Sequence, residues 1–164
     1  MPALRDGWST LRVARISAFS ALAVVGSFIH LPGPVQTVSF DSAPGFFAAL
    51  MFGPIEGALV IGIGHLATAT LDGLPLGSVH LPVALGLAVA GAIVGVVNRA
   101  GVRFRTFLAL AFGVVINVGL IVLAVPVLGW EATLLFAPFL ALAAIANALV
   151  AGFAFMGIRG KLRS

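Results

Sequence analysis

The chain has 164 residues, of which 61% are hydrophobic and only 9% are charged, and its mean hydropathy is +1.20. Because this small number of polar side chains cannot cover the surface of a soluble globular protein of this length, the composition predicts a membrane protein. The net charge of +4 does not require a nucleic-acid partner, because the basic residues lie in short segments beside apolar runs, where membrane orientation accounts for them. The absence of cysteine excludes disulfides and thiolate metal sites.

The nine basic residues fall in three clusters, separated by long apolar stretches. The clusters are Arg5, Arg12 and Arg15; Arg99, Arg103 and Arg105; and Arg159, Lys161 and Arg163. Short basic segments beside membrane spans stay on the cytoplasmic face. If all three clusters lie there, an even number of spans separates each cluster from the next.

Six apolar runs follow one another along the chain, at about 16–31, 43–54, 55–71, 79–97, 106–129 and 132–158. Pro54 divides the second run from the third, because proline begins a helix easily but cannot continue one. The second run is shorter than the roughly 20 residues that a perpendicular span needs. We therefore expect it to be buried among its neighbours, with residues 31–42 completing the outer part of its path.

Gly129, Trp130 and Glu131 interrupt the last long apolar stretch and predict a hairpin of two spans there. The fold class that follows is all-α. We predict a polytopic protein of the plasma membrane with six transmembrane helices, both termini cytoplasmic, and one domain over residues 1–164. The first apolar run is expected to be an uncleaved span.

Polar side chains are concentrated in the segments that this topology places outside, at about 31–42, 72–78 and 129–132. Such a gathering suits an outward-facing site for a small polar molecule. Deeper polar residues lie within the third, fifth and sixth runs, where an unpaired amide or imidazole in hydrocarbon costs a few kcal/mol. The candidate binding residues are Gln36, Thr37, Asp41, His65, Asp72, His80, Asn117, Trp130, Glu131 and Asn147.

Each candidate also has a purely structural explanation. Asp41 could cap the second helix, and Glu131 could compensate a helix dipole. Trp130 could lie in an interfacial belt, and Asn117 and Asn147 could bond only each other or backbone carbonyls. His80 could simply lie at the water boundary.

A stripe of small residues, Ala14, Ala18 and Ala21, follows the first run and flanks the first basic cluster. Small side chains let membrane helices approach closely. We expect this stripe to face another subunit.

The segments 38–50 (VSFDSAPGFFAAL) and 52–60 (FGPIEGALV) resemble the second and third helices of the S components of energy-coupling factor (ECF) transporters. Many of those carry a similar F-(S/D)-(S/D)-x-P start and a G-P-x-x-G turn. The similarity continues through 64–66 (GHL) and the loop 72–77 (DGLPLG). Size, number of spans and position of the termini agree with the family.

The resemblance implies a membrane-embedded binding protein for a vitamin or its precursor. Its partners would be a transmembrane T component and two cytoplasmic ATPases, with the small-residue stripe of the first helix contacting the T component. Of the family, members assigned to cobamide precursors such as α-ribazole are the most similar. Trp130, Phe46 and Phe47 could stack on a flat ring, and Asp41, Asp72 or Asn117 could bind ribose hydroxyls. Thiamin precursors, other flat vitamins and whole cobalamin stay open.

No metal site, catalytic residue or cofactor is expected. Pro2 stands where the family's nickel and cobalt members place a histidine, and no HExxH, GxSxG or nucleotide-binding GxxxxGK[ST] occurs. An intramembrane enzyme is therefore disfavoured. A stand-alone small-molecule carrier or channel is the alternative function, and uptake that survives loss of the partner ATPases would favour it.

Overall fold

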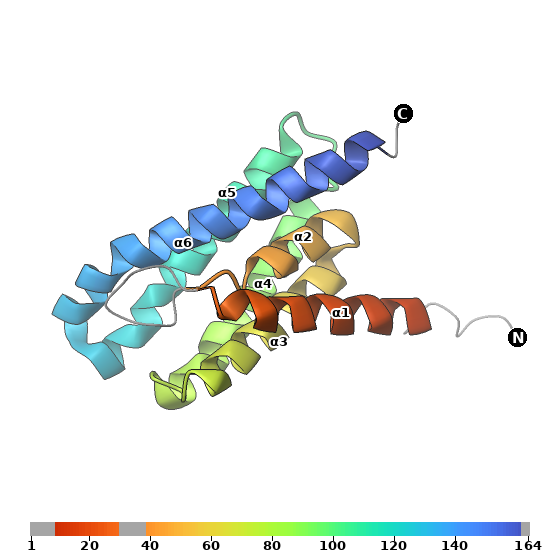
Figure 1. Cartoon of the computed structure of the whole chain (residues 1–164). Coiled ribbons are helices and arrows are strands. Elements are labelled where there is room, and N and C mark those ends of the chain that lie inside the picture. The colour runs from red at the N-terminus through yellow and green to blue at the C-terminus, as the bar shows by residue number, and fades with distance from the viewer. Residues whose placement is uncertain (1–8, 30–38, 162–164) are drawn as a thin grey trace, which may run out of the picture.

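The computed structural model describes residues 9–29 and 39–161, and every regular element in these ranges is a helix. The all-α prediction is therefore confirmed for the described part of the chain. In order, the elements are α1 (Thr10–Ser27), α2 (Ala43–Met51), α3 (Pro54–Leu71), η1 (Gly77–Val79), α4 (His80–Val97), α5 (Arg105–Gly119), η2 (Leu120–Ala124) and α6 (Val125–Lys161) (Figure 1).

Four helical ranges of the described chain are long and apolar enough to cross a membrane: α1, α3, Gly77–Val97 and Arg105–Lys161. The last range folds back on itself, because Gly129 leaves the helical conformation (φ 79°, ψ 166°) and α5 lies antiparallel to α6 (Figure 1). Leu110, near the start of α5, accordingly lies against Gly152, near the end of α6. α5 and α6 thus form a helical hairpin, as expected. The number of six complete spans and the cytoplasmic position of the termini stay predictions.

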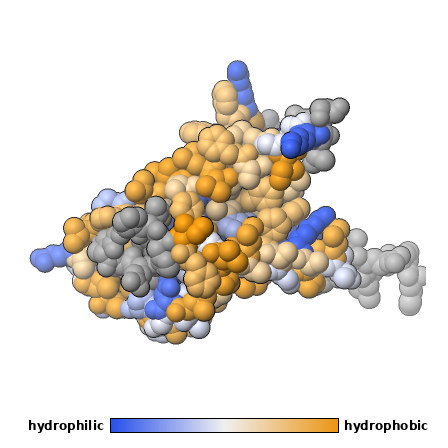
Figure 2. All heavy atoms as spheres, viewed as in Figure 1, coloured by the Kyte–Doolittle hydropathy of each residue, from blue (hydrophilic) through white to orange (hydrophobic). Residues whose placement is uncertain are grey.

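The second helix is short and buried, as expected. α2 has nine residues and is about 14 Å long at 1.5 Å per residue, so it cannot cross a bilayer alone. Every residue from Ala43 to Leu50 is buried. Its neighbours include α1, α3, α4 and α6, which surround it in Figure 1. Outside this core, apolar side chains cover most of the visible surface (Figure 2), as contact with lipid requires.

Glycines let α2, α3 and α4 approach closely. A Cβ atom on Gly91 of α4 would lie 2.7 Å from the carbonyl oxygen of Gly57 in α3, which is closer than such atoms can approach. On its other side, Gly57 faces Ala49 of α2. These backbone contacts leave no room for a side chain, so the small residues here serve internal packing.

Described arginines from all three basic clusters lie at one end of the bundle. Arg12 Nε donates a hydrogen bond to Glu56 Oε1 at 2.9 Å, and the guanidinium of Arg99 lies beside Gly53, close to the same carboxylate. Arg99, Arg105 and Arg159 line one surface depression. The segments 72–79 and 120–130 lie at the opposite end (Figure 1). This separation is the arrangement that the positive-inside pattern predicts.

The Gly91 contact predicts a large difference between two chemically identical substitutions. Gly91→Ala places a methyl group against the α3 backbone and should cost about 1–3 kcal/mol of unfolding free energy, lowering Tm by roughly 3–10 °C. Gly157→Ala, whose Cβ has no neighbour within 4 Å, is the matched control and should leave Tm nearly unchanged. Thermal unfolding in detergent measures both. Equal Tm values would show that α3 and α4 do not pack through Gly91.

Candidate functional site

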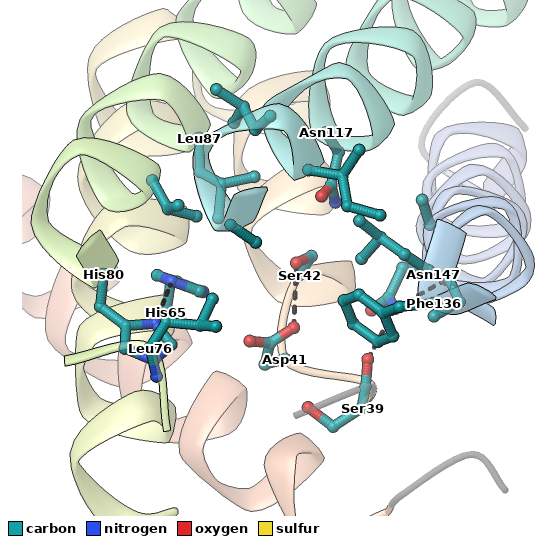
Figure 3. Close-up of a pocket in the computed structure, with 17 residues that line it drawn as sticks. Ser39, Asp41, Ser42, His65, Leu76, His80, Leu87, Asn117, Phe136 and Asn147 are labelled. Atoms are coloured by element: carbon teal, nitrogen blue, oxygen red, sulfur yellow. Dashed lines mark hydrogen bonds between the residues drawn. The ribbon is translucent and has the colours of Figure 1, made fainter. Parts of the chain in front are cut away.

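A cavity of about 80 Å³ lies at the end of the bundle away from the basic clusters. The segment before α2, together with α3, α4, α5, η2 and α6, contributes its walls (Figure 3). Its polar lining residues are Ser39, Asp41, Ser42, His65, His80, Asn117 and Asn147. Leucine, isoleucine, valine, alanine and one phenylalanine complete the lining. Polar groups from separate elements thus converge on one cavity in an apolar bundle.

Asn147 of α6 connects two walls of the cavity. Its Oδ1 accepts a hydrogen bond of 2.7 Å from the backbone N–H of Ala43, the first residue of α2. Its Nδ2 donates to the carbonyl oxygens of Ser39 and Ala143, both at 2.9 Å. The amide is buried and uses both of its ends, so it fixes where α2 begins.

Asp41 and Ser42 form the adjoining part of the wall. Ser42 occupies the N-cap position of α2 but makes no side-chain capping hydrogen bond, and its Oγ instead donates to Asp41 Oδ1 at 2.9 Å. The pKa of the Asp41 carboxyl is raised from 3.8 to about 6, chiefly by burial and to a smaller extent by the charge of Asp72, while the Ser42 hydrogen bond acts to lower it. The pair therefore presents a carboxyl group whose charge is costly inside the protein.

His65 and His80 form a hydrogen-bonded pair at the mouth of the cavity. The backbone N–H of Leu76 donates to His80 Nε2 at 3.2 Å, so in the neutral ring the proton of His80 lies on Nδ1. His80 Nδ1 lies 3.2 Å from His65 Nε2 and donates to it in this tautomer. His65 then carries its own proton on Nδ1. The chain of hydrogen bonds leaves one imidazole N–H donor at the end of the pair.

Asn117 of α5 and Phe136 of α6 complete the functional lining (Figure 3). The amide of Asn117 forms no hydrogen bond with another described residue, so it does not pair with Asn147, and it faces the cavity. Phe136 is buried and offers an aromatic face. An unpaired amide beside a ring suits a ligand that has both a flat apolar part and polar groups.

The structure brings together five of the ten residues that the sequence suggested: Asp41, His65, His80, Asn117 and Asn147. The lining does not include Asp72, Trp130 or Glu131. Trp130 is 64% exposed and Glu131 is also exposed. Gln36 and Thr37 lie outside the described residues.

The suggestion that Phe46 and Phe47 stack on a ligand is wrong for this structure. Phe46 is fully buried in the core, and Phe47 stacks on Phe19 of α1 with ring centroids 5.3 Å apart. Both point into packed helix contacts because α2 is buried on all sides. The aromatic residue that lines the cavity is Phe136, which sequence reasoning missed. Its spacing from Asn147, three helical turns along α6, was the available signal.

The small-residue stripe of α1 lies on a face of the helix that the described part of this chain leaves exposed. Ala14, Ala18 and Ala21 are exposed, whereas Ile16 and Ala23 of the same helix are buried. No described element of this chain covers the stripe. Its contact with another subunit stays a prediction.

The raised pKa of Asp41 predicts a pH-dependent stability. In the unfolded chain this carboxyl ionises near pH 3.8, and in the folded protein near pH 6, so its contribution is fully present below about pH 4 and is lost as the pH rises through about 6. Asp41→Asn replaces the carboxyl with an amide that does not ionise, so this loss of stability with rising pH does not occur in the variant. The fall in Tm between pH 4.5 and pH 7.5 should therefore be several degrees smaller in the variant than in the parent. Parallel curves would mean that the carboxyl is not buried as described.

A comparison with known protein families finds a match to the chain. The family model described as "ECF transporter, substrate-specific component" matches residues 11–160. No curated protein and no solved structure matches the chain. Because the match covers nearly all of the chain, this protein belongs to the family of substrate-specific components of ECF transporters.

Proposed function

We propose that this subunit binds a vitamin or vitamin precursor in the cavity beside α2, and that the ligand is α-ribazole or a related cobamide precursor. Membership of the family makes the chain a transport subunit of the membrane with a small-molecule substrate, a T component and ATPases as partners. The observation that carries the proposal is the convergence of polar side chains from five parts of the fold on one cavity.

The chemistry of the lining suits a flat ring joined to hydroxyl groups. Phe136 and Leu87 offer apolar surface to a heteroaromatic ring, on which a phenyl group stacks well. The free amide of Asn117 and the carboxyl of Asp41 can bind neighbouring hydroxyls as donor and acceptor. The N–H of His65 can donate to a ring nitrogen or to a further oxygen.

The cavity must widen to hold such a ligand. Its volume of about 80 Å³ is below the roughly 300–1,000 Å³ of sites for drug-sized molecules. Leu76 and the segment 39–42 are parts of the wall that lie outside the helices. Their outward displacement admits the ligand from the external side.

The proposed orientation in the membrane also determines on which side the T component and the ATPases act. Both termini and the three basic clusters lie on the cytoplasmic side, where two ATPases act through the T component. The exposed stripe Ala14, Ala18 and Ala21 on α1 contacts the T component, because its small side chains allow close helix approach.

Ligand binding by the isolated protein tests the proposal. The protein purified in detergent should release a small molecule that mass spectrometry identifies, and α-ribazole should raise its Tm more than a thiamin precursor or cobalamin does. Asp41→Ala combined with Asn117→Ala should weaken binding about tenfold or more, since each variant deletes a hydrogen-bonding group. Glu131→Gln, an exposed position outside the cavity, is the matched control and should keep the parent affinity.

Two results would contradict the proposal. One is the absence of a copurified ligand together with no thermal stabilisation by any compound of the panel. The other is unchanged affinity in the double variant, which would place the binding site elsewhere.

A further inference from the structure

A second hollow lies on the outer surface of the bundle, between α5 and α6. It has a volume of about 520 Å³ and is separate from the ligand cavity. Its lining is almost entirely apolar and includes Leu110, Ala111, Leu149 and Phe153, with Thr106 and Met156 at one end. Gly152 has no side chain, which deepens the groove where Leu110 lies.

The groove runs into a basic depression at one end. Thr106 and Met156 line both the groove and a smaller hollow whose other residues include Arg105 and Arg159. The guanidinium of Arg159 lies over the ring of Phe155, 5.7 Å from its centroid, and is held beside the helix. No acidic residue lines either hollow in the described part of the chain.

A neighbouring depression extends the positive charge. Arg105 and Arg159 also line a hollow that contains Arg99 and Asn98. Arg99 NH1 already donates to the carbonyl oxygens of Ala49 and Gly95, so its position is fixed and its charge remains close to the other two. Three guanidinium groups therefore stand at the cytoplasmic end of one apolar groove.

We propose that this composite surface binds one anionic phospholipid. An acyl chain lies in the groove between α5 and α6, and the phosphate lies between Arg105 and Arg159. Arginine is well suited to this role, because its planar guanidinium binds phosphate oxygens in pairs. Basic pockets between membrane helices on the cytoplasmic side are suited to anionic headgroups.

Charge distinguishes a lipid from the other occupants. A helix of another subunit, or of a second copy, would occupy the apolar groove but would use the two arginines only if it also carried an anionic group at that depth. An anionic phospholipid would use both the apolar groove and the arginines. Its acyl chain would lie toward the membrane interior and its phosphate toward the cytoplasmic surface. The inference does not depend on which molecule the cavity beside α2 binds.

Retention of defined lipids tests the inference. The protein is exchanged into detergent with equal amounts of dioleoyl phosphatidylglycerol and dioleoyl phosphatidylcholine, and native mass spectrometry counts the adducts. Each arginine near an anionic headgroup contributes about a fivefold gain in binding, so a preference for phosphatidylglycerol of roughly 25-fold is expected. Arg105→Gln combined with Arg159→Gln should abolish this preference. Arg103→Gln, which removes a charge at the same end but outside both hollows, should retain it.

The groove has its own test. Ala111→Trp fills it and should reduce retention of both lipids, whereas Leu85→Trp on the exposed face of α4 should not. Equal retention of the two lipids by the parent would overturn the proposal. So would a preference that survives in the double arginine variant, or a dimer of this chain that forms with loss of bound lipid.

Discussion

The hydrogen bonds of Asn147 are the constraint on which the rest of this structure depends. α2 begins inside an apolar bundle, and its N-cap serine provides no side-chain capping bond for the first N–H groups of the helix. An unpaired backbone group in such a place costs several kcal/mol. A side chain from α6, 104 residues further along the chain, accepts from Ala43 and donates to Ser39. The start of α2 is therefore held in place by α6, the last helix of the fold.

This connection explains why a helix too short to cross the membrane is stable there. The glycine contacts with α3 hold the body of α2 by close backbone approach, and Asn147 holds its start. Before that start the chain turns through Asp41 and Ser42 instead of forming a further helical turn, and these residues line the candidate cavity. A polar pocket in an apolar bundle thus follows from ending a helix inside the bundle.

The sequence could predict the parts of the fold that depend on composition and on single strong signals. Pro54 divided the second and third helices, Gly129 marked the hairpin, and the clustered arginines predicted a common end. It also predicted hydrogen-bond partners for the deep amides, which is confirmed for Asn147, whereas Asn117 has no such partner among the described residues. These signals depend on the composition of a single segment and do not depend on the rotation of a helix about its axis.

The geometry of the candidate site could not be predicted in the same way. Which face of a helix points inward depends on rotation, and nearly uniform apolar helices carry no strong amphipathic pattern to fix it. Phe136 was missed for this reason, and Phe46 was given a role although it lies in the core. Trp130 lies only six residues before Phe136, which lines the cavity, but Gly129 leaves the helical conformation next to Trp130 and the tryptophan is exposed. The partners of Asn147 are backbone groups, which no residue pattern reveals.

Hydrogen–deuterium exchange of Asn147→Ala tests the central claim most directly. If the amide of Asn147 holds the start of α2, amides over residues 39–50 should exchange much faster in the variant, while those of α1 and α4 stay protected. Asn117→Ala, which removes an amide that makes no bond to α2, should leave exchange in 39–50 unchanged. Parent-like exchange over 39–50 in Asn147→Ala, or an equal increase throughout the chain, would contradict the account.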